Sequence, residues 1–448
     1  MSRPVRRRRG PLRANSPAGQ LVEEELVVEK IVPGGRGFGR LSDGRAAMID
    51  GGFPGDRVRL CVTDARGAYV EGRAELIQAG TPRVEPPCAW ASRCGGCDWM
   101  ALSVDDQRRL KLDLVREALR RTAGIAELPG GLELVSAGQP LGYRSRIRLQ
   151  VDGGKIGFYA AGSRELVEVE SCLVSSAELQ EALAALRSFA RRHAPAVFEH
   201  VELRVAPGAN RASLFFSARR GSHVSVGERR ALDELRREFL VSVRGEPGSE
   251  SAEVERFDLP GAYVLAPPGA FTQVNWEVNR ALVDAVVQGA LRRRASSFAD
   301  LYSGSGNFSL PLLRAGLSGK GVEVSAASIE CAQRAAREQG LGGEFFAGDV
   351  GRVAARWATA GQRYDLVVLD PPRAGAKEAL DSVVRLAGRA VVLIACDPVT
   401  FARDLRVLMD RGLVLEEVRA FDMFPQTHHV ECLAWLRVEP DAPRSVSM

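Results

Sequence analysis

The sequence lacks the features that would tie it to a membrane. No uninterrupted apolar run reaches the roughly 18 residues that a bilayer-crossing helix needs. Arginines crowd the segment from Met1 to Arg13, but neither an apolar segment nor a small-residue cleavage site follows, as a secretory signal would require. We therefore expect a cytoplasmic protein without a membrane partner.

The chain also lacks a large excess of positive or negative charge. The chain has 61 Lys and Arg against 56 Asp and Glu, and the net charge of +5 by itself favours no partner. The positive charge is uneven, because residues 1–20 contain six arginines and no acidic residue. We predict that this segment is a basic disordered tail, which would add sequence-independent attraction to phosphates.

The length and the cysteines narrow the class further. A chain of 448 residues is too long for one ordinary core, so several domains are expected, and no internal repeat is present. Apolar residues make up 45% and charged residues 26%, as in globular proteins. The eight cysteines should be reduced thiols, so a local cluster of them suggests metal binding or catalysis before disulfides.

The N-terminal and middle segments have the pattern of β-rich domains. Between about Val22 and Leu76, short strand-like runs alternate with Gly-rich turns, which predicts a small β-barrel over residues 21–80. The turns carry arginines that suit phosphates, although ordinary hairpins explain them equally well. A second domain, residues 81–260, is expected to contain an amphipathic helix from Val104 to Arg121 and then more strands.

Three arginines alternate along one predicted strand of this second domain. Arg144, Arg146 and Arg148 are separated by single residues, and this spacing places them on one face of the strand. That face is either solvated or turned toward RNA, and the pattern does not decide between them.

The C-terminal part, residues 261–440, changes character to strand, turn and helix units. This alternation predicts an α/β domain with a doubly wound parallel sheet. Its predicted strands are Ser297–Leu301, Gly319–Glu323, Gly343–Phe346, Leu366–Leu369, Ala390–Ile394, Val414–Ala420 and Glu431–Arg437.

A Gly-rich turn after the first of these strands suggests a nucleoside site. Gly304 and Gly306 open the turn, and Glu323 ends the next strand, where a carboxylate can accept hydrogen bonds from ribose hydroxyls. The third glycine of a dinucleotide fingerprint is missing, so a pyrophosphate has no good place. The pattern favours a nucleoside cofactor without phosphates.

Two later strands deliver reactive groups to the same predicted sheet edge. Asp370 and Cys396 each follow a buried strand, where open α/β sheets place their ligands. A buried cysteine is often inert, but a thiol before a Pro-containing turn that opens a helix is placed as a nucleophile. The helix N-terminus would lower its pKa from about 8.5, whereas Asp397, if it faces the sulfur, would oppose that shift.

The segment from Phe421 to Glu431 joins the last two strands. Glu431 starts an apolar run, where a carboxylate is costly unless it has a role or a partner. The adjacent His428 and His429 would point opposite ways on an extended chain, so we interpret them as loop residues rather than metal ligands.

A cysteine cluster is the second constellation. Cys88, Cys94 and Cys97 are tightly spaced, Gly95 and Gly96 lie between the last two, and Cys172 follows much later. Three close thiols and a distant fourth are typical of iron–sulfur ligation more than of paired zinc knuckles. Zinc remains the alternative.

Together these residues resemble the RNA 5-methyluridine methyltransferase family, in the branch that has a TRAM domain and a 4Fe-4S cluster. The likeness runs from about Val22 to Val438. Six ordered motifs carry it: Cys88-x5-Cys94-Gly95-Gly96-Cys97, Phe271-Thr272-Gln273-Val274-Asn275, Asp300-Leu301-Tyr302-x-Gly304-x-Gly306-Asn307-Phe308, Asp370-Pro371-Pro372-Arg373-Ala374-Gly375, Cys396-x-Pro398, and Asp422-Met423-Phe424-Pro425-x-Thr427-x-His429-x-Glu431.

The resemblance implies a class I, Rossmann-like methyltransferase domain, a TRAM domain with an OB-like fold as the N-terminal barrel, and a central iron–sulfur and RNA-contact domain. It implies Cys396 as the nucleophile and Glu431 as the base that removes the C5 proton. S-adenosylmethionine contacts would fall on Gln273, Tyr302, Asn307, Glu323, Asp349 and Asp370. The cluster ligands would be Cys88, Cys94, Cys97 and Cys172.

The implied reaction explains these residue types. Carbon 5 of uracil is too weak a nucleophile to take a methyl group unaided, so a thiolate first adds to carbon 6. The sequence departs from the family at Met100, where glutamine is usual, at Ser303, often cysteine, and at Asp397, usually asparagine. None of these changes removes the thiol or a predicted ligand.

The presence of the TRAM and cluster segments favours 23S rRNA over tRNA as the partner of a monomeric enzyme. A tRNA 5-methyluridine enzyme is one alternative. An RNA 5-methylcytosine methyltransferase is another, but those enzymes generally have a Cys after a proline in the loop, and Asp370-Pro371-Pro372 has none. An inactive RNA-binding relative is disfavoured by intact Cys396 and Glu431.

Overall fold

The computed structural model describes residues 23–209, 211–245 and 254–439, so the predicted basic tail, residues 1–20, lies outside the described residues. Contacts divide the chain into two units. The first runs to Pro82 without Pro33–Gly35, and the second comprises Pro33–Gly35 and the chain from Arg83 onward. In the described ranges no helix is both long and apolar enough to span a bilayer.

The first unit is a six-stranded sheet of short strands in the order β1-β5-β6-β4-β3-β2. Val58 and Leu60 are fully buried while Arg57 is exposed, and this period of two explains why the segment forms a strand. The strands are β1 (Glu23–Val27), β2 (Lys30–Val32), β3 (Arg36–Arg40), β4 (Ala46–Asp50), β5 (Arg57–Arg66) and β6 (Tyr69–Gln78).

The second unit contains a central six-stranded sheet in the order β10-β9-β8-β11-β12-β13, with two helices packed against its apolar side. The elements are β8 (Arg146–Asp152), β9 (Lys155–Tyr159), β10 (Leu166–Glu168), α2 (Ala177–His193), β11 (Phe198–Arg204), β12 (Ser213–Ala218), α3 (Val226–Arg236) and β13 (Leu240–Val243). A hairpin of β14 (Glu255–Leu259) and β15 (Ala262–Ala266) leads to the C-terminal part.

The predicted row of three arginines is only partly correct. Arg146 and Arg148 lie on one face of β8, as the alternation requires, but Arg144 precedes the strand and donates to the Tyr143 hydroxyl. Arg146 and Arg148 both approach the buried Glu202 of the neighbouring β11, at 3.6 and 3.4 Å. Because that carboxylate draws the two guanidiniums onto the sheet, only Arg148 stays largely exposed, at 54%.

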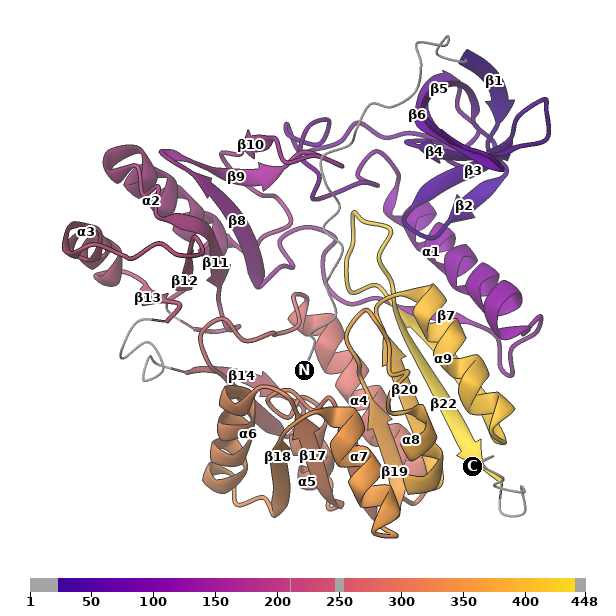
Figure 1. Cartoon of the computed structure of the whole chain (residues 1–448), viewed down its shortest axis with the longest axis vertical. Helices are drawn as coiled ribbons and strands as arrows, with labels where there is room; N and C mark the ends of the chain where they lie inside the picture. The colour runs from indigo at the N-terminus through magenta and orange to yellow at the C-terminus, as the bar shows by residue number, and fades with distance from the viewer. Residues whose placement is uncertain (1–22, 210, 246–253, 440–448) are drawn as a thin grey trace. The chain divides into compact units, whose positions relative to one another are not determined.

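The C-terminal part is an eight-stranded sheet in the order β18-β17-β16-β19-β20-β22-β21-β7 (Figure 1). The five strands β16 to β20 are parallel, and β22 runs antiparallel between β20 and β21. The strands are β16 (Ser297–Leu301), β17 (Ser318–Glu323), β18 (Gly343–Ala347), β19 (Tyr364–Leu369), β20 (Ala387–Ala395), β21 (Leu413–Phe421) and β22 (Glu431–Val438). All seven predicted strands are confirmed.

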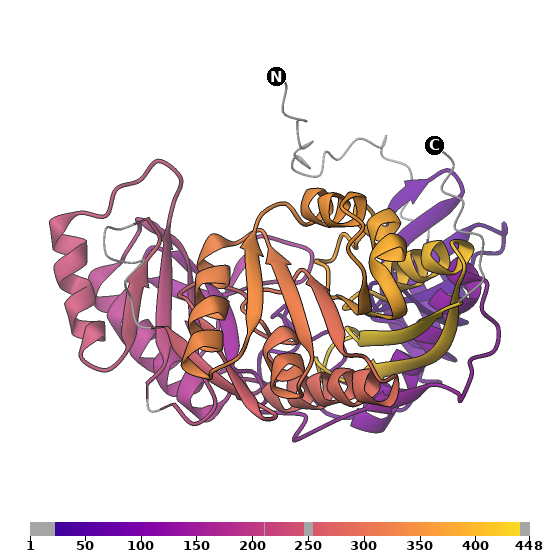
Figure 2. The same cartoon turned by 90° about the horizontal axis from the view of Figure 1, so that it is seen from below.

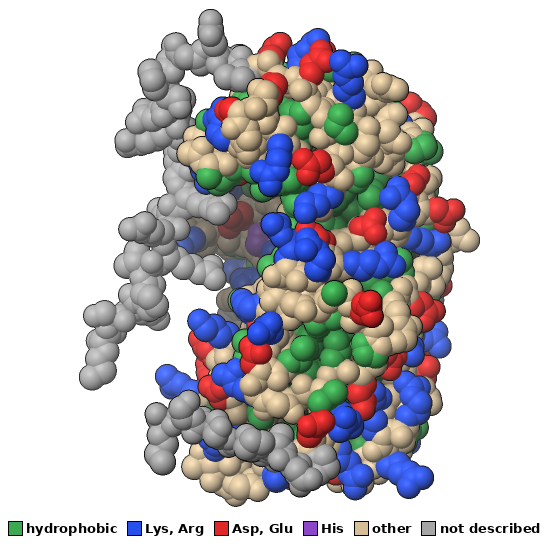
Figure 3. Space-filling view, turned by 90° about the vertical axis from the view of Figure 1, so that its right-hand side faces the viewer, with side chains coloured by type: hydrophobic (Ala, Val, Ile, Leu, Met, Phe, Trp, Pro, Cys, Tyr) green, Lys and Arg blue, Asp and Glu red, His purple; other side chains and the backbone are tan. Residues whose placement is uncertain are grey.

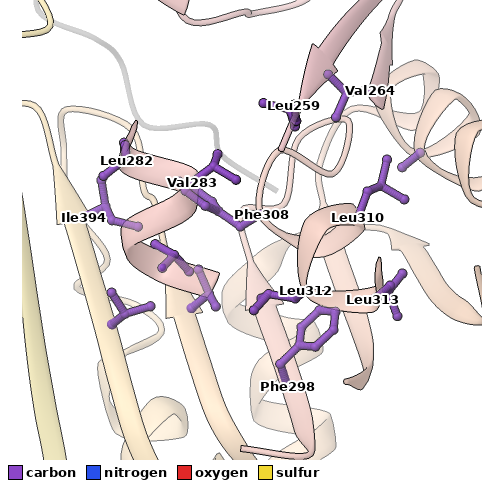
Figure 4. Packing of buried hydrophobic residues seen from close by; sticks show 14 of the residues in the cluster. Leu259, Val264, Leu282, Val283, Phe298, Phe308, Leu310, Leu312, Leu313 and Ile394 are labelled. Carbon is purple, nitrogen blue, oxygen red and sulfur yellow. The ribbon is translucent and has the colours of Figure 1, made fainter. Parts of the chain in front are cut away.

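Helices cover both faces of this sheet (Figure 2), as a doubly wound topology requires. One face carries α4 (Trp276–Arg292), α5 (Ser309–Arg314) and α6 (Ala326–Glu338), and the other carries α7 (Val350–Thr359), α8 (Leu380–Leu386) and α9 (Pro398–Asp410). Figure 4 shows the hydrophobic core between the sheet and the helices α4, α5 and α6, where Leu282 and Val283 of α4 lie near Ile394 of β20 and Phe308.

A segment from the N-terminal half completes this sheet. Helix α1 (Val104–Ala118), which continues as one π-helical turn from Leu119 to Ala123, packs on the face that carries α9, and β7 (Glu133–Val135) pairs in parallel with β21. The Ser103 hydroxyl caps α1 by accepting from the Asp106 amide. Residues 104–135 therefore pack with the C-terminal sheet rather than with the central one.

Candidate active site

The candidate residues meet at one edge of the C-terminal sheet. Parallel strands end on the same side, so the residues that follow them lie along one crevice. Because β22 is antiparallel, its first residue, Glu431, starts at that same edge, and the pairing of Ala395 with Cys432 puts Glu431 next to Cys396. Glu323 is the last residue of β17, and the residues that follow the other parallel strands are Tyr302, Asp349, Asp370 and Cys396.

The Gly-rich turn and the acidic end of β17 are joined by hydrogen bonds. The Gly304 amide donates to Glu323 Oε2 at 3.3 Å, and the Ser325 amide donates to Oε1 at 2.9 Å. Tyr302 has a φ of 74°, a backbone conformation that non-glycine residues rarely adopt. The chain therefore turns sharply here while the carboxylate keeps lone pairs for further donors.

Helix α4 holds the far side of this turn. The amide groups of Asn279 and Asn307 exchange two hydrogen bonds, at 2.9 and 3.1 Å. Gln273 is buried three residues before the helix, where its carbonyl accepts from the Ser145 hydroxyl. The Asn307 side chain thus links the turn to α4. Because Gln273 lies shortly before α4, this link also holds the segment of Gln273 near the turn.

Two buried polar atoms beneath the turn have no partner among the described residues. Asp300 is fully buried, and its Oδ2 accepts from the Ser309 hydroxyl at 2.5 Å while its Oδ1 is unpaired. The Ser303 hydroxyl is the other unpaired atom. Burial raises the pKa of Asp300 to about 7. Buried polar atoms without a partner are suited to bind a polar ligand here. In the sequence, the motif that begins at Asp300 indicated this site.

Comparison with known proteins agrees with this geometry. The family model for tRNA (uracil-5-)-methyltransferases matches residues 359–439. The 23S rRNA (uracil(1939)-C(5))-methyltransferase RlmD of Pseudomonas putida is 33% identical over 92% of this chain and 93% of its own length. The protein of the same name from Halomonas elongata is 35% identical over 98% of this chain and 94% of its own.

The chain belongs to the RNA uracil-5-methyltransferase family. Among solved structures, the Pyrococcus abyssi tRNA (uracil-54, C5)-methyltransferase in complex with S-adenosyl-L-homocysteine superposes with a TM-score of 0.70 at 24% identity. The superposition covers 92% of this chain and 100% of that one. The likeness shows that both share a class I methyltransferase fold.

The uracil-5-methyltransferase fold places Cys396 among ionisable groups. Burial raises the thiol pKa to about 11, and Glu431 and Asp370 add to the increase, while the Arg373 guanidinium opposes it. The expected lowering by the helix N-terminus is therefore wrong for the protein without RNA. Asp397 was expected to raise the thiol pKa if it faced the sulfur. Instead its carboxylate caps α9, because Oδ1 accepts from the Thr400 amide at 2.8 Å.

Glu431 is buried with 3% exposure, as its place at the start of an apolar strand predicts. Burial and the nearby Asp370 raise its pKa well above the usual range, and Arg373 opposes this increase. Burial also raises the pKa of Asp370. The crevice thus contains two carboxyl groups, of Asp370 and Glu431, and the Cys396 thiol, and the pKa of each of the three groups is raised.

Arg373 is a functional candidate that the sequence reasoning missed. It interacts electrostatically with Cys396, Glu431 and His429. Helix α9 fixes its loop, since the Thr400 hydroxyl donates to the Arg373 carbonyl at 3.2 Å. The sequence contains the Asp-Pro-Pro-Arg motif, but the motif does not reveal which groups the guanidinium faces.

The two histidines are loop residues, as interpreted, but the expectation that their side chains point opposite ways is wrong. His428 and His429 do lie in a loop, but their rings are only 4.1 Å apart, and both line a pocket together with Arg373, Cys396 and Asp397. The reason is that residues 422–430 are not extended, so adjacent side chains need not point opposite ways.

The four predicted cluster cysteines come together in the second unit. Cys94 pairs in an isolated bridge with Ala160. The pKa of Cys97 is raised to about 12, first by burial and also by the other three thiols, Cys88, Cys94 and Cys172. The Gly96 amide donates a hydrogen bond to the Cys94 sulfur. Within the described ranges, no three His, Cys, Asp or Glu side chains are arranged as a preformed metal site.

Proposed function

We propose that this protein transfers a methyl group from S-adenosylmethionine to carbon 5 of a uridine in 23S rRNA. The single observation that carries the proposal is the placement of Cys396, directly after β20, beside Glu431, the first residue of the adjacent β22, at the sheet edge that also holds the Gly-rich turn. Relatives named for 23S rRNA, which span nearly the whole chain, favour that RNA. A tRNA is the second candidate, because the Pyrococcus abyssi enzyme is named for it.

In the proposed reaction Cys396 adds to carbon 6 of the base and makes carbon 5 enolate-like. S-adenosylmethionine supplies the methyl group to carbon 5. Glu431 then takes the proton that carbon 5 still holds, and the thiol leaves by elimination. Arg373 favours the charged forms of both Cys396 and Glu431, so it supports the attack and the proton removal alike.

The proposed cofactor contacts are Gln273, Tyr302, Asn307, Glu323, Asp349 and Asp370. Glu323 is the best placed for ribose hydroxyls, because it sits at the end of β17 beside the turn. The Asn307 side chain is engaged with Asn279, so its contribution would come through the turn that it fixes. Asp349 caps α7 with one carboxylate oxygen, and the other remains for the ligand.

Replacing Glu323 by Ala is expected to weaken S-adenosylmethionine binding by roughly 1.5–3 kcal/mol, the range for a hydrogen bond that involves a charged group. Isothermal titration calorimetry measures the change without RNA. Glu344→Ala is the matched control, because Glu344 lies on the neighbouring β18 and is exposed. Equal affinities for Glu323→Ala and the wild type would contradict the assignment.

The rate of adduct formation is expected to rise with pH above neutrality. A thiol whose pKa is raised to about 11 is protonated at pH 7, so each unit by which the pH rises toward that value increases the thiolate fraction about tenfold. Arg373→Gln should slow the reaction roughly tenfold at pH 7 and move its rise to higher pH, because the cation that lowers the thiol pKa is lost. Single-turnover rates between pH 6.5 and 9.5 test this.

The matched control for that series is Arg356→Gln, on the exposed side of α7. Its pH profile should coincide with that of the wild type. Rates for Arg373→Gln that equal those of the wild type at every pH of the series would show that the guanidinium does not act on the thiol.

The four-cysteine site is proposed to hold a 4Fe-4S cluster. Support comes from the mutual electrostatic interaction of the four thiols and from the Gly96 amide that faces the Cys94 sulfur. Cys172 reaches this place because it follows β10, which pairs with β9, and the Gly95 amide donates to the Tyr159 carbonyl at the end of β9. When bound, the cluster would tie residues 88–97 to the central sheet.

Anaerobically purified protein is expected to be brown and to contain about four irons per chain. Cys172→Ala should lose the iron despite its distance in sequence from the other three thiols. Cys61→Ala, in the first unit, is the control that should keep it. Zinc as the only stoichiometric metal, measured by plasma emission spectrometry, would favour the alternative.

RNA contact is proposed for the TRAM-like first unit and for the central sheet. Phe271, 70% exposed, has the Arg146 guanidinium 4.7 Å from its ring centre, a combination that suits an unstacked base. Cationic and anionic side chains are interspersed over the face in Figure 3, so net charge alone does not mark the RNA path. Specific aromatic and arginine pairs are better markers.

The target RNA is tested by deleting the gene and mapping 5-methyluridine in ribosomal and transfer RNA. The proposal expects one position of 23S rRNA to lose the methyl group and to regain it with the plasmid-borne wild type. Loss from tRNA alone would select the second candidate. No loss from either RNA would overturn the proposal.

A further inference from the structure

Side chains of α1, more than 300 residues earlier in the chain, hydrogen-bond the loop that precedes Glu431. Lys111 of α1 is fully buried, and its Nζ donates to Asp422 Oδ1 at 2.6 Å and to the Phe424 carbonyl at 2.9 Å. Gln107, one turn earlier, exchanges hydrogen bonds with Gln426 through its amide group, at 2.9 and 2.8 Å. A buried ion pair and a paired amide therefore fix residues 422–426 in one conformation.

This fixed loop leads to His429, which lies in the same pocket as the thiol. The His429 ring packs edge-on against Phe424, with centres 5.7 Å apart, and it lines the same pocket as Cys396 and Arg373. Its backbone amide donates to the Thr427 hydroxyl. In the part of the chain that the structure describes, neither ring nitrogen has a hydrogen-bond partner, so both are left for a ligand.

The surroundings keep this imidazole neutral. The pKa of His429 is lowered to about 4, mainly by burial and also by His428, Arg373 and Lys111, while Asp98 opposes this decrease. A neutral imidazole has one N–H donor and one acceptor nitrogen. In that neutral form the ring can donate a hydrogen bond through its N–H.

The proposed reaction has one step that needs such a donor. When the Cys396 thiolate forms its bond to carbon 6, the electron pair of the C5–C6 double bond moves to carbon 5 and is shared with the neighbouring carbonyl oxygen. A pre-placed donor at that oxygen lowers the barrier, and removal of one such donor typically costs about 10²–10³ in rate.

We propose that His429 is a further catalytic residue, whose ring N–H donates to the pyrimidine carbonyl oxygen that becomes negative when Cys396 adds. The inference rests on the proposed function, because it needs a uracil beside Cys396. It assigns to the loop a role separate from that of Glu431: His429 assists the addition, and Glu431 completes the elimination.

The test uses 23S rRNA transcribed with 5-fluorouridine and the full-length protein. Fluorine at carbon 5 cannot be removed as a proton, so the methylated adduct accumulates, and its rate of formation reports addition and methyl transfer without the elimination step. His429→Leu should form the adduct about 10²–10³ times more slowly than the wild type. His429→Gln, which keeps an N–H donor, should recover at least a tenth of the wild-type rate.

Two further measurements separate this role from a structural one. S-adenosylmethionine affinity should be equal in the wild type, His429→Leu and His429→Gln, and His223→Leu, a surface control on the central domain, should form adduct at the wild-type rate. Wild-type rates for His429→Leu, or equal rates for the Leu and Gln variants, would overturn the assignment. No adduct with wild-type protein on either 23S rRNA or tRNA would instead overturn the proposed function beneath it.

Discussion

Cys396→Ala is expected to abolish both methylated product and any covalent RNA adduct while leaving S-adenosylmethionine affinity unchanged. The thiol acts before methyl transfer, so nothing downstream can occur without it. Its half-buried position at the end of β20, outside the Gly-rich turn, explains why the cofactor should bind normally. Denaturing gels with methyl-labelled cofactor, and calorimetry without RNA, measure the two quantities.

Cys61→Ala is the control for this experiment, since its thiol lies in the first unit. A labelled adduct that persists in Cys396→Ala would contradict the assignment. Mapping its attachment to Cys432 would be the most direct contradiction, because Cys432 is the thiol on the neighbouring strand. A loss of cofactor affinity would show that Cys396 supports the Gly-rich turn as well.

The strands of the C-terminal sheet could be predicted from the sequence, because each is a short apolar run bounded by turn residues. The edge on which Asp370 and Cys396 lie followed from topology alone, since parallel strands end on one side. The placement of Glu431 depended on the resemblance, and the antiparallel β22 supplies its physical reason.

The contacts between distant segments could not be predicted. Lys111 looks like a solvent-facing charge on an amphipathic helix, and only the fold reveals Asp422 beside it, 311 residues later. The same holds for β7, a three-residue strand that finds its partner β21 near the end of the chain. Local sequence patterns do not encode such pairs. The hydrogen bonds from α1 that fix residues 422–426, and the position of His429 beside Cys396 in one pocket, are therefore visible only in the structure.

The state of the thiol was misjudged for a related reason. A cysteine before a helix N-terminus suggests a low pKa, but burial and two carboxyl groups from other strands outweigh that effect. In the protein without RNA, the raised pKa therefore favours the protonated form of the proposed nucleophile. Arg373 is the described group that acts in the other direction on Cys396 and Glu431 together.

Glu431→Gln is expected to stop the reaction after methyl transfer rather than before it. The amide cannot take the proton from carbon 5, so the thiol should add and the methyl group should move, but elimination should not follow. The stalled species is a methylated RNA bound to Cys396. It should appear on a denaturing gel as a slowly migrating band that carries the label of the cofactor methyl, and free methylated RNA should be absent.

Glu417→Gln, on the adjacent β21, is the matched control, and it should turn over as the wild type does. On RNA with 5-fluorouridine, Glu431→Gln should form adduct as fast as the wild type, because that substrate has no proton for the base to remove. A normal turnover of Glu431→Gln on ordinary RNA would require another base, and the half-buried Asp370 would then be the first to replace, because its carboxyl lies close enough to raise the pKa of Glu431.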